Sequence, residues 1–142
     1  MTTINPYLNF PGTTEEAFNF YRSVFGGEFA MVQRFGDTPD GGKMSPQLKS
    51  KIMHMSLPIG NGNILMATDA IEEMGHHVTP GNNFYICISP DTKEEADRLY
   101  KGLSAGGKVG TALQDMFWGA YYGDFTDKFG IKWMINYTHP RK

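Results

Sequence analysis

Short runs of alternating apolar and polar side chains recur along this chain, a pattern typical of strands in a half-buried sheet. In the last run, 131–137, large apolar side chains occupy one face and mixed polar side chains the other. The turn Asp127-Lys128-Phe129-Gly130 joins this run to 120–126 and predicts a hairpin, with Asp127 capping the turn and Gly130 supplying positive φ. The predicted strands are 4–10, 28–35, 51–57, 63–69, 83–88, 108–116, 120–126 and 131–137.

Two segments show helical spacing instead, and they resemble each other. The first begins Thr13-Thr-Glu-Glu-Ala and the second Thr92-Lys-Glu-Glu-Ala. Thr13 and Glu16 have the spacing of a capping box, so Thr13 is expected to cap its helix with its side chain. A Gly-Gly pair, at 26–27 and again at 106–107, ends each helical pattern.

The chain therefore repeats one order of elements, βαβββ. We expect a single domain, 1–142, with module 1 at about 1–70, a linker at about 71–81 and module 2 at about 82–142. One helix covers only one face of a module's sheet, so the other face needs a partner. The repeat predicts an α+β fold in which two βαβββ modules form a curved, mostly antiparallel, eight-stranded sheet around a cleft, with the helices outside.

Alternation also assigns side chains to the two faces of each predicted strand. The apolar sets, expected under the helices, are Leu8 and Phe10; Met53, Met55 and Leu57; Leu65 and Ala67; Phe84, Ile86 and Ile88; Trp133, Ile135 and Tyr137. The sets expected to line the cleft are Asn5, Tyr7 and Asn9; Ile52, His54 and Ser56; Ile64, Met66 and Thr68; Asn83, Tyr85 and Cys87; Lys132, Met134 and Asn136. The cleft lining repeats as well, because Asn5-x-Tyr7 matches Asn83-x-Tyr85 and Met66 matches Met134.

Composition narrows the classes of partner. The 142 residues carry a net charge of −2 and contain no basic run, which argues against nucleic acid. No apolar run approaches the ~20 residues that cross a bilayer, and the first residues lack the pattern of a signal peptide. The single cysteine, Cys87, forms no internal disulfide, and we expect it to be a small buried strand residue in a cytoplasmic protein.

Two polar segments carry no strong signal for chemistry. The Gly-, Pro- and Asp-rich segment 36–49 is expected to be a long mobile loop, because it lacks the complete ligand series of a calcium loop. His76 and His77 lie in the predicted linker. Adjacent histidines point apart on most backbones, so we expect both to be solvated rather than metal ligands.

The candidate chemistry centres on His54, the only histidine that alternation places in the cleft. It would act as a general base or as a hydrogen-bond partner for a ligand, and the alternative is a polar residue on a half-exposed strand. Asp115 could stand near it. Phe117 and Trp118, at a glycine-rich bend, would either stack on a planar ligand or plug the base of the hairpin. The expected ligand-binding side chains are Tyr7, His54, Met66, Asn83, Tyr85, Trp118, Lys132 and Met134.

The C-terminal motifs carry a resemblance to a known family. The segment Phe117-Trp118-Gly119, the turn Asp127-x-Phe129-Gly130 and Trp133 together resemble the PhnB-like branch of the vicinal oxygen chelate superfamily, which includes glyoxalases, bleomycin-resistance proteins and extradiol dioxygenases. The resemblance spans the whole chain and implies the same two-module fold. It also implies a homodimer, because members commonly complete their clefts by pairing or swapping modules, and the apolar strand edges here need cover.

Metal-dependent members carry His, Gln or Glu on the first and last strands of each module. The matching positions here are Asn5, Met66, Asn83 and Met134. Two neutral amides and two thioethers offer no negative charge to a divalent cation, so we expect no metal and no cofactor. No glycine-rich turn suited to S-adenosylmethionine is present either.

Three functions remain open after this comparison. The first is a metal-free cleft that binds a small aromatic or apolar molecule, with the reaction unassigned. The second is a metal-dependent lyase, isomerase or dioxygenase of the glyoxalase type, with His54 and His76 or His77 as ligands. The third is a protein that sequesters a ligand, like the drug-resistance members, for which this cleft has few carboxylates.

Overall fold

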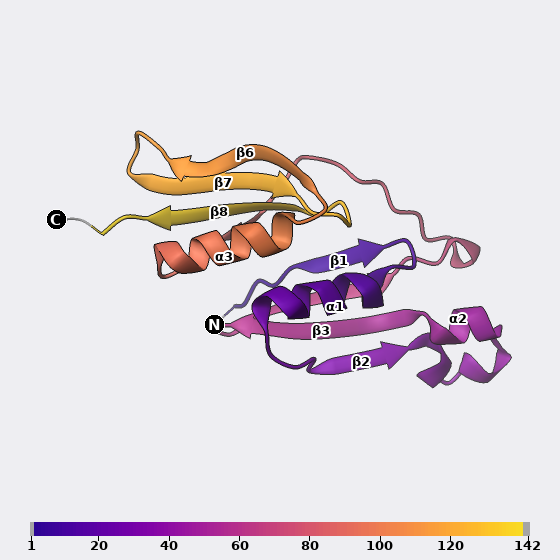
Figure 1. Cartoon of the computed structure of the whole chain (residues 1–142). Helices are drawn as coiled ribbons and strands as arrows, with labels where there is room; N and C mark the ends of the chain where they lie inside the picture. The colour runs from indigo at the N-terminus through magenta and orange to yellow at the C-terminus, as the bar shows by residue number, and fades with distance from the viewer. Residues whose placement is uncertain (1, 141–142) are drawn as a thin grey trace. The chain divides into compact units, whose positions relative to one another are not determined.

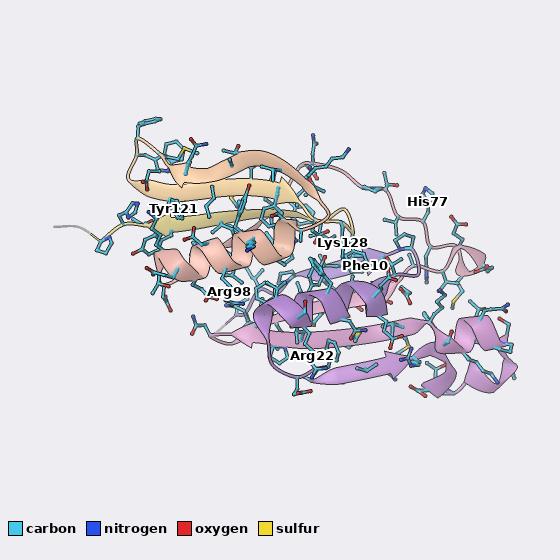
Figure 2. The ribbon with its side chains drawn as sticks, viewed as in Figure 1. Phe10, Arg22, His77, Arg98, Tyr121 and Lys128 are labelled. Carbon is cyan, nitrogen blue, oxygen red and sulfur yellow. The ribbon has the colours of Figure 1, made fainter. Side chains whose placement is uncertain are left out.

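The computed structural model describes residues 2–140 and divides into two compact units, with the boundary between Thr79 and Pro80. Each unit contains one four-stranded sheet and a long helix that packs against it (Figure 1). The expected α+β class and the two βαβββ modules are confirmed. The helices carry arginines on their exposed sides, Arg22 on the first and Arg98 on the other (Figure 2).

The first unit has the sheet order β1-β4-β3-β2, with β1 parallel to β4 and the other pairs antiparallel. Helix α1 packs on β3 and β4. Its elements are β1 (Tyr7–Phe10), α1 (Thr14–Phe25), β2 (Met31–Arg34), η1 (Phe35–Asp37), η2 (Gly41–Lys43), α2 (Pro46–Ser50), β3 (Ile52–Gly60), β4 (Asn63–Asp69) and η3 (Glu72–Met74).

The second unit repeats this topology with the sheet order β5-β8-β7-β6, and β5 is parallel to β8. Helix α3 packs on β8, β7 and β6. The elements are β5 (Ile86–Ile88), α3 (Lys93–Ser104), β6 (Lys108–Asp115), β7 (Ala120–Thr126) and β8 (Lys132–Thr138). Thr92 caps α3 as its position in the repeat predicts, because its hydroxyl accepts from the backbone N–H of Glu95 at 3.1 Å.

The helix-facing side of each sheet forms the core of its unit. In the first unit Leu8, Leu57 and Leu65 are at most 4% exposed, and in the second Trp133 and Ile135 are fully buried. These positions were predicted from the alternation. Burying such large apolar side chains supplies most of the stability of each unit, at about 1.5–3 kcal/mol per side chain.

The β7–β8 turn is built on Asp127, as predicted. Its Oδ1 accepts from the backbone N–H groups of Phe129 and Ile131, and its Oδ2 accepts from the indole N–H of Trp133 at 2.8 Å. Gly130 has a φ of +91°, a conformation that side chains with a Cβ rarely adopt. The turn therefore satisfies its own backbone and also fixes the largest core side chain.

Several expectations about the first unit are wrong. The pairing of β2 with β3 shifts register between Gln33 and Arg34, which turns Ile52 into the core at 1% exposure and leaves Met53 half-buried. Thr13 makes no side-chain cap. The N–H of Thr14, the first residue of α1, donates instead to the Asp69 carboxylate at 2.9 Å.

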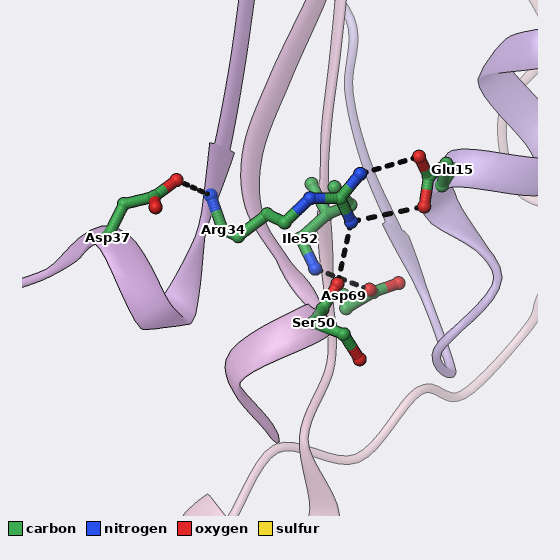
Figure 3. Close-up of polar contacts among 6 residues, drawn as sticks. All are labelled: Glu15, Arg34, Asp37, Ser50, Ile52 and Asp69. Atoms are coloured by element: carbon green, nitrogen blue, oxygen red, sulfur yellow. Dashed lines mark hydrogen bonds and ion pairs between the residues drawn. The ribbon is translucent and has the colours of Figure 1, made fainter. Parts of the chain in front are cut away.

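The segment 36–49 is not the irregular loop that was expected, because it contains most of η1, all of η2 and most of α2. Arg34 anchors it (Figure 3): its guanidinium donates to the Glu15 carboxylate at 2.6 and 3.1 Å and to the Ser50 carbonyl at 2.7 Å, and its backbone N–H donates to Asp37. The bond to Arg34 lowers the pKa of Glu15. A Cβ at Gly41 would lie 2.3 Å from the carbonyl oxygen of Gly36, so only glycine fits this close approach.

The start of the second unit also departs from the prediction. The strand expected at 83–88 is formed only by β5, so Phe84 lies outside the sheet and is 67% exposed rather than buried under a helix. Cys87 is exposed as well. Phe84 is exposed because it precedes this short strand, whereas Cys87 is exposed because it pairs with Met134 on the sheet face opposite to the buried Trp133 and Ile135.

Candidate functional site

One candidate site lies on the sheet face of the first unit that α1 does not cover. Tyr7 on β1 and Met66 on β4 are cross-strand partners. A hydrogen bond of 3.3 Å joins the Tyr7 hydroxyl to Nδ1 of His54 on β3, and their ring centroids are 5.7 Å apart. Alternation thus predicted the face of all three side chains.

The His54 imidazole is positioned rather than loose. The Tyr7 hydroxyl engages Nδ1, while Nε2 has no hydrogen-bond partner among residues 2–140. Tyr7 is 47% exposed and His54 is half-buried. This arrangement leaves one ring nitrogen able to accept or donate a proton at the surface of the sheet.

The uncovered face of the second unit brings together another set of expected residues. Nζ of Lys132 donates to Oγ1 of Thr126 at 2.9 Å and lies 5.7 Å from the ring centroid of Tyr85. Met134 on β8 pairs with Cys87 on β5. Asn83, in contrast, is exposed and precedes β5, so it joins neither strand.

Two residues of this face, Tyr122 and Asp124 on β7, were missed from the sequence. The Tyr122 hydroxyl donates to Oδ2 of Asp124 at 2.9 Å, and the backbone N–H of Thr111 donates to Oδ1 at 3.0 Å. Burial, followed by the bond to Asp124, raises the pKa of Tyr122 to about 12. The sequence pattern could have identified them, because alternation within β7 puts both residues on the face that does not carry the buried Phe125.

The aromatic bend before β7 borders this cluster. Trp118 packs edge-to-face on Tyr122, with ring centroids 6.1 Å apart, and remains 56% exposed. Phe117 is 98% exposed and touches Trp118 edge-on, at 5.0 Å between centroids. Neither ring plugs the base of the hairpin, and both are accessible for stacking.

The registers of the two sheets identify equivalent positions. Met66 is opposite Tyr7 on the neighbouring strand. In the second unit Ile86 is opposite Trp133, so the preceding residues, Tyr85 and Lys132, are matched when this register is extended by one position. In the sheets, Met66 therefore corresponds to Lys132, whereas the sequence pattern matched it to Met134.

The same registers relate His54 to Asp124. In the first unit His54 precedes the buried Met55, which is opposite Ala67 on β4. In the second unit Asp124 precedes the buried Phe125, which is opposite Trp133 on β8. The repeat thus places an imidazole in one unit and a carboxylate in the other at equivalent positions, each bonded to a tyrosine hydroxyl.

The four positions that the family resemblance matches to metal ligands hold two amides and two thioethers. Oδ1 of Asn5 accepts from the backbone N–H of Ile64 at 3.0 Å, so this amide joins the start of β1 to β4. Met66 and Met134 present thioethers, which bind hard divalent ions poorly. Within residues 2–140 no three His, Cys, Asp or Glu side chains are placed to hold a metal ion.

The other candidates have local partners. Asp115 bonds to Nε2 of His139 at 2.6 Å, which lowers the pKa of the carboxyl group. Nδ1 of His76 accepts from the backbone N–H of Ile71 at 3.3 Å, and the exposed His77 lies 3.9 Å from Glu72. As a separate observation, none of the helices within residues 2–140 has the length and the apolar composition that a membrane-spanning helix requires.

Comparison with known proteins agrees with this architecture. Protein YjdN from Escherichia coli (strain K12) is 29% identical over 141 residues, covering 94% of this chain and 93% of YjdN. The crystal structure of protein PA1353 from Pseudomonas aeruginosa shares 36% identity and a TM-score of 0.85, covering 99% of this chain and 100% of that one. A PhnB protein from Bacillus cereus shares 25% identity and a TM-score of 0.76, covering 96% and 100% of the two chains.

A family-level match covers nearly the whole chain. Residues 3–135 match the family described as the Glyoxalase/Bleomycin resistance protein/Dioxygenase superfamily. The match includes both βαβββ units and therefore does not rest on one motif. This chain belongs to the Glyoxalase/Bleomycin resistance protein/Dioxygenase superfamily, with PhnB-like relatives.

Proposed function

We propose that this protein binds small aromatic or apolar molecules without a metal, on the sheet faces that α1 and α3 leave uncovered, each within its own unit. The observation that carries the proposal is the gathering of tyrosines and polar groups on these faces, Tyr7 with His54 and Tyr122 with Asp124. Aromatic walls with a few placed polar groups are typical of sites for small molecules.

The side chains at the positions matched to metal ligands support binding without a metal. Of the four positions that correspond to metal ligands in relatives, Asn5 already uses its amide oxygen within the sheet and Asn83 lies off the strand. The two methionines carry no charge to offset a divalent cation.

The test combines metal analysis with binding. Protein purified without a histidine tag should contain no stoichiometric transition metal by elemental analysis, and indole should bind by isothermal titration calorimetry after dialysis against a chelator. Tyr7→Ala should weaken binding at the first face, whereas Met74→Ala, which removes an exposed apolar side chain from η3, outside the sheet, should not. About one metal ion per chain, lost on mutating Met66 or Met134, would favour a glyoxalase-type lyase, isomerase or dioxygenase instead.

A second candidate function is sequestration of a ligand without turnover, as in drug-resistance members of the superfamily. Asp124 favours it, because this carboxylate supplies the negative charge that a cationic ligand requires. Recovery of an added ligand unchanged after prolonged incubation would support sequestration, and appearance of a product would exclude it.

We further propose that the protein is a cytoplasmic homodimer. The edge strands expose apolar side chains, with Met31 and Val32 on β2 and Val109 on β6 between 42% and 53% exposed. Pairing between copies would cover such edges.

A further inference from the structure

We infer that the uncovered face of the second unit selects small aromatic molecules that carry both a cationic nitrogen and a carboxylate. This inference rests on the proposed binding function and names the ligand class for one face. Its basis is a pair of opposite charges, Asp124 and Lys132, that share this face without pairing with each other. Among residues 2–140, neither side chain makes an ion pair within 4.0 Å.

The Asp124 carboxylate is held in place by neutral groups. The Thr111 N–H and the Tyr122 hydroxyl each occupy one oxygen, which leaves a further lone pair on each for a ligand. Gly110 makes room for this arrangement, because a Cβ there would come within 2.3 Å of Oδ1 of Asp124. The Tyr122 hydroxyl is protonated at neutral pH and donates to this carboxylate, a bond that, after burial, contributes to its raised pKa.

Lys132 is oriented in a similar way. Its ammonium donates to Thr126 and lies over the ring of Tyr85, so two of its three N–H groups remain available. Asp124 pairs with Met134, two residues beyond Lys132, which makes the two charges diagonal neighbours across β7 and β8. Such neighbours are about 7–8 Å apart at the backbone, a separation that an amino group and a carboxylate on one small molecule can bridge.

Aromatic rings border the two charges. Trp118 lies against Tyr122, while Tyr85 is 38% exposed beside Lys132 and is near enough to Tyr122 to contribute to its raised pKa. A flat ring on these side chains would bring its charged substituents toward Asp124 and Lys132. A ligand with only one charge would face attraction from one residue and repulsion from the other.

Four probes that share one ring system test this inference: tryptophan, tryptamine, indole-3-propionate and indole. Their affinities for the intact protein are measured by isothermal titration calorimetry at neutral pH and low salt. Tryptophan should bind at least tenfold more tightly than indole and more tightly than either singly charged probe. Asp124→Asn should remove the advantage that the amine confers, and Lys132→Met the advantage of the carboxylate. The matched controls are Asp91→Asn, just before the N-cap of α3, and Lys101→Met, on α3; both sites are exposed and lie outside β7 and β8, so all four affinities should be unchanged.

The possible outcomes separate the two proposals. If indole binds as tightly as tryptophan, the assignment of an amphoteric ligand is wrong and the aromatic-binding function stands. If none of the four probes binds, both proposals fail for this ring class. The four affinities of the unmodified protein test the ligand class even if a variant does not fold. Gly110→Ala, which displaces Asp124 without removing its charge, should weaken tryptophan and leave indole unaffected.

Discussion

The Asp69 carboxylate joins the N-terminus of α1 to the sheet that carries Tyr7, His54 and Met66. Asp69 is 2% exposed, and its oxygens accept from the backbone N–H groups of Thr14 at 2.9 Å and Ile52 at 2.8 Å. Figure 3 shows its bond to Ile52. We predict that Asp69→Ala destabilises the first unit substantially.

The magnitude follows from the two donors that would lose their partner. Both N–H groups are buried, since Thr14 is 0% and Ile52 is 1% exposed. A buried donor left unsatisfied costs about 1–3 kcal/mol, and loss of a helix cap costs ~1 kcal/mol. These terms overlap at Thr14, and water entering the space left by the carboxylate reduces them. We therefore expect a loss of about 3 kcal/mol in the free energy of unfolding.

Urea denaturation followed by circular dichroism measures this change. The matched control is Asp37→Ala, which also removes a carboxylate that accepts from a backbone N–H, that of Arg34, but at an exposed site. The control should cost no more than about 1 kcal/mol. A loss below about 1 kcal/mol for Asp69→Ala, or equal losses for both variants, would show that the buried carboxylate does not support α1 and β3 as described.

Three further predictions concern ionisation, binding and assembly. Tyr122 should ionise near pH 12 rather than near its ordinary pKa of 10.0. Because its pKa is raised in the folded state, the stability that it contributes is present below about pH 10 and is lost as the pH rises toward 12. Spectrophotometric titration of the wild type and of Tyr122→Phe measures this ionisation. His54→Ala should weaken binding of an aromatic probe to the first unit by tenfold or more, about 1.4 kcal/mol, with little change in stability, and the opposite pattern would make His54 a structural residue. Light scattering at micromolar concentration should give the mass of a dimer, and a monomer would contradict the proposed pairing.

The sequence by itself determined the repeat, the two long helices and most strands. Helix signals and strand alternation are local, since each depends on residues within a few positions of one another. β4 and β7 have the predicted bounds, and the turn at Asp127 forms as its residue types require. The face of His54 followed from the same alternation, and its contact with Tyr7 is consistent with that assignment.

Tertiary structure decided the features that depend on distant segments. A register shift between β2 and β3 places Ile52 in the core. The residues of β3 alone do not predict this shift, because it depends on how β3 pairs with β2. Asp69, 55 residues beyond Thr14, takes the place of Thr13 at the start of α1, because its buried carboxylate accepts from the backbone N–H of Thr14.

Tertiary structure also decided which charged groups meet on the uncovered face of the second unit. Alternation indicates that Tyr122 and Asp124 share a side of β7, but only the sheet brings the Thr111 N–H to the carboxylate and sets Lys132 on the neighbouring strand. Local patterns determine which way a side chain points. The pairing of strands determines which charges it meets there, because cross-strand neighbours come from segments far apart in the sequence.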